Sequence, residues 1–174
     1  MNIIDAKKDD NDDPVMQHAK MLGQLITNLH SLELFIRVFL HHKNPAPPFE
    51  LPICSDNTKD IHAGSNIPVN HLTNYDSLGS LIDQYNIEMN EHERDKLDRS
   101  IVTLRDAIAH GRVFTYSPDV PPSLVKFSKP NKNTVRVEFC EVMTPDWLHA
   151  QNVKVVSAIN TIGPKIGWKR LDQT

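Results

Sequence analysis

One short segment of the chain combines two side-chain types that phosphodiester chemistry needs. Arg105 and His110 lie five positions apart at the end of a predicted helix, and Asp106 follows the arginine. Cleavage of RNA requires a base for the ribose 2′-OH, a cation for the charge on phosphorus and an acid for the leaving 5′-oxygen. Histidine can be that base or acid near neutral pH, and the guanidinium fork of arginine matches phosphate oxygens. The segment is therefore a candidate catalytic site.

Asp106 precedes His110 by four residues, so the two side chains share one face of a helix. We expect the carboxylate to orient the imidazole during catalysis. A purely structural interpretation is also open, in which Arg105 pairs with Asp106 or Glu138 on the surface and His110 caps the helix end. The sequence alone leaves both interpretations standing.

The run from Leu104 to Gly111 resembles the signature of the HEPN superfamily, in which an arginine and a polar residue are followed after a short interval by a histidine. The resemblance implies a helical bundle with Arg105, Asp106 and His110 in a metal-independent endoribonuclease site that uses no cofactor. It also implies a composite site formed by two motifs across a homodimer. The family's toxin and phage-defence roles make an antitoxin or regulatory protein a candidate partner, beside RNA. The resemblance is sharp over 104–111 and loose over 13–170.

Two alternatives to catalysis stay open. One is a HEPN-like module that binds RNA or a nucleotide, or dimerises, without cutting. The other is a plain helical interaction module, because the first predicted helix is apolar over an unusually wide face. The same arginine–histidine spacing recurs at Arg37 and His42, but Val38 follows that arginine and hydrophobic residues fill the interval. We therefore discount the second pair.

Signatures of other chemistries are missing from the sequence. It has no phosphate-binding loop, no dinucleotide fingerprint, no nucleophile elbow and no His-Glu-x-x-His zinc motif. Cys54 and Cys140 are too few for a disulfide scaffold and favour a reducing compartment. Because no signal peptide and no membrane-spanning run are visible, we expect a cytoplasmic protein without a membrane partner. Because the zinc motif is missing, we also expect no metal site.

Composition and charge predict one folded domain with an acidic tip. The 174 residues are 39% hydrophobic and 24% charged, which is ordinary for a globular protein. Residues 1–13 hold five aspartates against two lysines and so account for the whole net charge of −3. We expect a flexible acidic tail over 1–13 and a single domain over 14–174. Its neutral body disfavours non-specific binding of nucleic acid but leaves room for a local basic groove.

Hydrophobic periodicity predicts a mainly α fold of four helices with a small β appendage before the last helix, and the resemblance implies that these helices form a HEPN-like four-helix bundle. The period changes from helical to alternating over 112–142, where turn residues at 129–133 indicate a hairpin. Residues 43–74 hold five prolines and form a long loop that is either functional or partly disordered. The predicted helices are 13–42, 75–87, 91–110 and 145–163.

Local signals predict where these helices begin and end. Asn90 followed by Glu93 resembles a capping box that opens the third helix. Gly111 is expected to end it in the left-handed conformation at C′. Thr144 is expected to cap the last helix, and Pro164 to stop or kink it.

Overall fold

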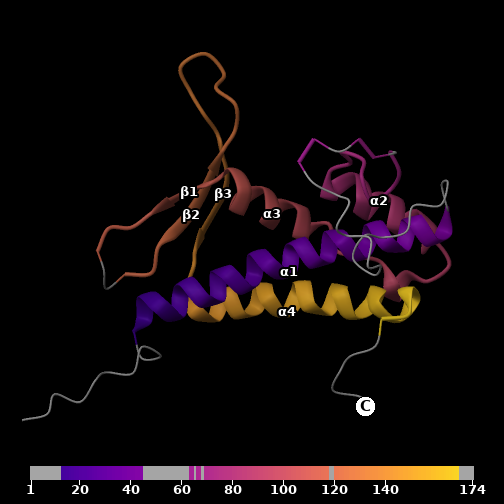
Figure 1. The fold of residues 1–174 in the computed structure, drawn as a ribbon. Coiled ribbons are helices and arrows are strands. Elements are labelled where there is room, and N and C mark those ends of the chain that lie inside the picture. Colours follow the sequence, from indigo (N-terminus) through magenta and orange to yellow (C-terminus); the bar gives the residue numbers. More distant parts are fainter. Residues whose placement is uncertain (1–12, 45–62, 65, 68, 118–119, 169–174) are drawn as a thin grey trace, which may run out of the picture. The chain divides into compact units, whose positions relative to one another are not determined.

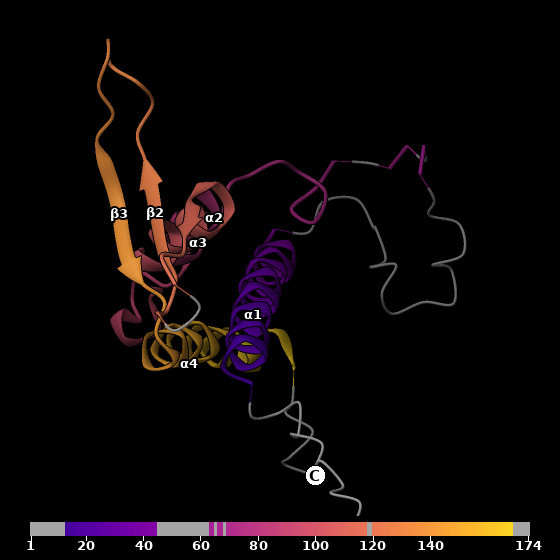
Figure 2. The same cartoon turned by 90° about the vertical axis from the view of Figure 1, so that its left-hand side faces the viewer.

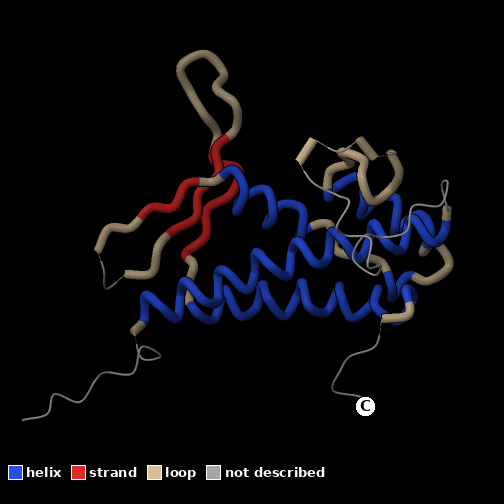
Figure 3. Tube along the Cα trace, viewed as in Figure 1, coloured by secondary structure: helices blue, strands red, loops and turns tan. Residues whose placement is uncertain are grey.

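The structure is a computed structural model that describes residues 13–44, 63–64, 66–67, 69–117 and 120–168. Within these ranges it is mainly helical, with one three-stranded antiparallel sheet inserted before the last helix, as predicted (Figures 1 and 3). Residues 1–12 of the acidic tail expected over 1–13, and most of the 43–74 loop, lie outside the described residues. The elements are α1 (Pro14–Lys43), α2 (Leu78–Glu88), α3 (Ser100–His110), β1 (Arg112–Phe114), β2 (Ser123–Phe127), β3 (Val137–Val142) and α4 (Pro145–Ile162), with short 3-10 helices at Glu93–Asp95 and Gly163–Ile166.

The chain divides into two compact units. The first contains Met1–His30, described from Asp13 onward, and Ser100–Ser157; the second contains Ser31–Arg99 and Ala158–Thr174, described to Trp168. Both long helices, α1 and α4, therefore contribute one part to each unit. The expectation of a single domain stays a prediction. None of the described helices has the length and hydrophobicity needed to cross a membrane.

In the first unit the sheet has the strand order β1-β2-β3, and all its pairs are antiparallel. Figure 2 shows β2 and β3 running in opposite directions. Arg112 on β1 pairs with Val125 on β2, and the register between β2 and β3 shifts at Lys126 and Phe127. The expected hairpin turn is confirmed by a bridge between Asn131 and Thr134. The sheet follows α3 directly, so its first strand continues the chain from His110.

Capping and a polar bridge organise the helices of this unit. The Val15 N–H donates to Asp13 Oδ1 at 2.9 Å, and the Trp147 N–H donates to Thr144 Oγ1 at 3.1 Å, which confirms the predicted cap of α4. The Asn28 side chain on α1 donates to that of Asn152 on α4 at 2.9 Å. The buried apolar residues of the unit include Leu25, Leu29, Ile101, Leu104, Ala107, Leu124, Met143, Leu148 and Val155.

The second unit packs the C-terminal part of α1 with α2 and the end of α4. Phe39 meets Tyr85 edge to face, with ring centroids 4.8 Å apart. The Ser77 hydroxyl accepts from the Ser80 N–H, so α2 begins at Leu78, three residues later than predicted. The predicted stop near Pro164 is confirmed, because α4 ends at Ile162. The buried apolar residues of the second unit include Leu32, Ile36, Phe39, Leu40, Leu78, Leu81, Ile82, Tyr85, Met89, Leu97, Ile159 and Ile162.

The helix predicted over 91–110 is wrong in its first half, because α3 begins only at Ser100. The Asn86 side chain donates to the Leu97 carbonyl at 3.0 Å and accepts from the Leu97 N–H at 2.8 Å. These two bonds occupy the backbone groups that a helix would use at Leu97. The backbone N–H of Asn90, expected in a capping box, instead closes the turn after α2. A long-range side-chain contact therefore overrides the local helical pattern.

Candidate active site

The three predicted site residues lie in the last two turns of α3. His110 is the final residue of the helix and is exposed. The Arg105 and Asp106 side chains are each 39% exposed. All three are therefore accessible to solvent, while Leu104 and Ala107 on the same helix are buried and anchor it.

A chain of ion pairs links α3 to the sheet. Arg105 Nη1 lies 3.3 Å from Asp106 Oδ1, and Asp106 Oδ2 lies 4.0 Å from Lys126 Nζ. Lys126 Nζ in turn lies 3.2 Å from Glu138 Oε2. Two cations and two anions thus alternate beside His110, and the charges of this network balance.

Lys126 is the residue of this network that sequence reasoning missed. It stands two positions after the buried Leu124 on β2, and alternate residues of a strand share a face. A lysine on the core-facing side of a strand signals an acidic partner on the neighbouring element. Because its partner Asp106 lies on α3, only the tertiary structure could identify the pair.

Asp106 forms ion pairs with Arg105 and Lys126, and within the described residues no ion pair joins it to His110. The structure thus brings Arg105 and Asp106 together but does not connect Asp106 to the imidazole. Orientation of His110 by Asp106 stays a prediction. It requires the carboxylate to leave its present partners.

Gly111 ends the helix as expected, but for a different reason. Its φ is not positive, so the predicted left-handed conformation is wrong. A Cβ at this position would lie 2.3 Å from the Ala107 carbonyl oxygen, 2.9 Å from Leu124 Cδ1 and 3.2 Å from the Val125 carbonyl oxygen. Glycine is required here because the Ala107 carbonyl oxygen of α3, together with Leu124 and Val125 of β2, leaves no room for a Cβ.

The discounted pair, Arg37 and His42, provides a useful comparison, because Arg37 is only 8% exposed. Its guanidinium donates to Glu33 Oε1, to the backbone carbonyls of His71, Asn74 and Asp76, and to Asn74 Oδ1. This arginine holds the turn over 70–76 against α1. The donors of Arg37 are committed to the fold, whereas in the part of the chain that the structure describes Arg105 has one ion pair, to its sequence neighbour Asp106.

Metal ligands do not gather at this site or elsewhere in the described ranges, where no three His, Cys, Asp or Glu side chains are placed to hold an ion. Comparison with models of known families, with characterised proteins and with solved structures gives no significant match for this chain. The site must therefore be interpreted from its own residues.

Proposed function

We propose that this protein is a metal-independent endoribonuclease of the HEPN type, with Arg105 and His110 as its catalytic residues in a HEPN-like helical bundle. One observation carries the proposal. An arginine that keeps donors available, and an exposed histidine, lie five residues apart on one short helix. In the second pair with the same spacing, Arg37 is buried and its donors bond to the fold, whereas His42 is exposed, so the sequence pattern alone does not distinguish the two arginines.

The reaction follows from the chemistry of these groups. One His110 takes the proton of the ribose 2′-OH as the 2′-oxygen forms a bond to phosphorus. The bond between phosphorus and the 5′-oxygen breaks, and His110 of the partner subunit gives that oxygen a proton. The products are a cyclic 2′,3′-phosphate and a free 5′-OH. General acid–base catalysis of this kind contributes roughly 10²–10⁴ in rate.

Arg105 is the group that neutralises the phosphate in this mechanism. To do so its guanidinium must exchange Asp106 for phosphate oxygens. A half-exposed ion pair of this kind is worth about 1 kcal/mol or less, so the exchange costs little. The two N–H groups of a guanidinium edge can then bind two phosphate oxygens at once. Lys126 remains beside Asp106 and can take over that carboxylate.

The proposal includes a homodimer, because one chain supplies one Arg105 and one His110. A two-fold axis would bring the second pair to the same phosphate. The exposed apolar side chains of α1, among them Met16, Ile26 and Leu34, support such a partner. Light scattering should give twice the monomer mass at high micromolar concentration. A strict monomer would exclude the composite mechanism.

A second function, RNA or nucleotide binding without cleavage, is favoured by one observation. Asp106 and Glu138 neutralise the two cations of the network. If that neutralisation persists in the complex, the site holds a phosphate without stabilising the extra charge of the transition state. Both functions predict binding, and only the first predicts products.

The experiment compares cleavage of mixed RNA by purified variants in EDTA. His110→Ala and Arg105→Ala should each lower the rate by at least about 10². Arg105→Lys should stay impaired, because an ammonium cannot form the bidentate contact. Asp106→Asn should cost less than either. His149→Ala removes another exposed histidine, on α4, and is the matched control that should cut like wild type.

A further inference from the structure

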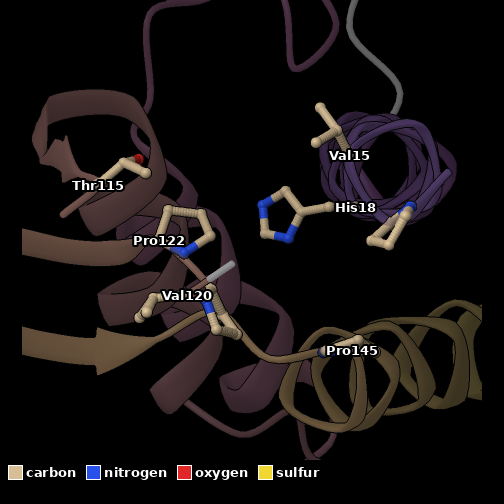
Figure 4. Close-up of a pocket in the computed structure, with 8 residues that line it drawn as sticks. Val15, His18, Thr115, Val120, Pro122 and Pro145 are labelled. Atoms are coloured by element: carbon tan, nitrogen blue, oxygen red, sulfur yellow. The ribbon is translucent and has the colours of Figure 1, made fainter. Parts of the chain in front are cut away.

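A hollow of about 410 Å³ lies in the first unit, at the start of α1 and α4 (Figure 4). Val15 and His18 of α1 line one side, and the connection between β1 and β2 lines the other with Thr115, Val120 and Pro122. The His18 ring points from the helix toward Pro122 (Figure 4). The volume lies within the range of small-molecule sites, which are concave and mostly apolar.

Prolines make up half of the described lining of this hollow. Four of its eight lining residues are prolines, and two of them begin the helices α1 and α4. A proline has a fixed φ and almost no side-chain entropy to lose when a ligand covers it. Little of the binding free energy is then spent on ordering the site, which favours affinity for a small molecule. The lining prolines are Pro14, Pro121, Pro122 and Pro145.

The charge of the lining selects the type of ligand. Among the described residues, the polar side chains of its lining are His18 and Thr115, and none of the eight is Lys, Arg, Asp or Glu. Asp13 and Asp146 adjoin the first residues of the two helices, and their carboxylates disfavour an anion. Burying a charged group of the ligand without a partner costs free energy. A ligand with one hydrogen-bonding group can instead form a hydrogen bond with the His18 imidazole or the Thr115 hydroxyl.

We propose that this hollow is a binding site for a small, uncharged, mainly apolar molecule that carries one hydrogen-bonding group. Val15, Val120 and the prolines enclose the apolar body, and His18 and Thr115 bind the polar group. Val15 is 62% exposed, so the binding of such a molecule would cover an apolar side chain that now faces solvent. The inference does not depend on the proposed ribonuclease activity.

The test uses two fluorescent probes with the same ring system. N-phenyl-1-naphthylamine is uncharged and has one N–H; 8-anilinonaphthalene-1-sulfonate adds a sulfonate. Titration of the full-length protein should give saturable binding of one uncharged probe per chain. The sulfonate should bind at least about tenfold more weakly, because none of the eight described lining residues is a Lys or Arg that could compensate the desolvation of its charge. Equal or tighter binding of the sulfonate would overturn the proposal.

Variants locate the probe. Val15→Asp should weaken the uncharged probe at least about tenfold, because it places a carboxylate in the apolar wall. Val153→Asp, an exposed valine of α4 in the same unit, is the matched control and should bind like wild type. Val120→Trp should also reduce binding by filling the hollow. Circular dichroism verifies that each variant is folded. No saturable binding to wild type, or equal binding to all folded variants, would overturn the assignment.

Discussion

The backbone N–H of Gly111 donates to the carbonyl oxygen of Ala107 at 2.7 Å. This bond closes the last turn of α3 and fixes the path of the chain directly after His110. Leu124 of β2 packs over the same point, so close that a Cβ on residue 111 would lie 2.9 Å from its Cδ1. The end of the helix, the start of the sheet and the candidate catalytic histidine are therefore positioned by one contact.

Gly111→Ala should lower the free energy of unfolding by about 1–3 kcal/mol, because the new methyl group overlaps backbone atoms that cannot move independently. Urea denaturation measures this change. Gly23→Ala on α1 is the matched control, since nothing lies within 4 Å of the added Cβ. That substitution should raise stability by up to about 1 kcal/mol through helix propensity. Equal stability of the two variants would contradict the close approach.

Arg37→Met should destabilise the protein by about 3 kcal/mol, because it leaves backbone carbonyls and the Glu33 carboxylate without their donor. Arg99→Met removes an exposed pair with Asp83 and should cost less than about 1 kcal/mol. Urea unfolding curves of the two variants give the comparison. A small effect at Arg37 would mean that its bonds to the 70–76 turn do not hold that turn in solution.

Tyr85→Phe should raise stability by up to about 1 kcal/mol, because the Tyr85 hydroxyl is fully buried and has no hydrogen-bond partner among the described residues. Burial, and then the charge of Asp95, raise the pKa of Tyr85 to about 12. Because this pKa is higher than in the unfolded chain, its contribution to the free energy of unfolding is fully present below about pH 10 and is lost as the pH rises toward 12. The wild type should therefore lose stability over that interval more steeply than the variant in alkaline thermal melts. Tyr75→Phe, at an exposed position, should change neither quantity.

Asp95 should make stability depend on acid pH. Its hydrogen bond from Lys165 Nζ, at 2.6 Å, holds the pKa of its carboxyl below the ordinary value. With a lowered pKa, the unfolded state binds the proton first, so this contribution is present above about pH 4 and is lost as the pH falls through that region. Asp95→Asn and Lys165→Gln should both flatten the acid limb of an unfolding-midpoint profile. An unchanged slope in both variants would exclude this pair as a cause.

How far the sequence predicted the fold depended on the range of the contacts involved. Helix starts at Asp13 and Thr144 were predictable because each cap bonds to a backbone N–H two or three residues away. The start of α3 was not, because Asn86 reaches Leu97 across eleven residues. Gly111 was predictable as the end of its helix, but its close approach to Leu124 and Val125 on β2 was not, because that strand comes later in the chain.

The candidate site shows the same limit. Arg105, Asp106 and His110 were recognisable because they lie within six residues of one helix. Lys126 was not, because its pairing with Asp106 depends on how β2 lies on α3. The sequence pattern also could not predict that Arg37 is buried and Arg105 half exposed. Each arginine directly follows an apolar residue of a helical stripe, so the two positions look alike in the sequence.

The central claim is cleavage of RNA through its own 2′-OH by His110, without a metal ion. Mass spectrometry of the RNA ends produced in EDTA tests it most directly. The account predicts cyclic 2′,3′-phosphate and 5′-OH ends from the wild type, with their yield at least about 10² lower from His110→Ala. Ends carrying a 3′-OH and a 5′-phosphate, equal cleavage by His110→Ala, or no cleavage by a confirmed dimer would contradict it.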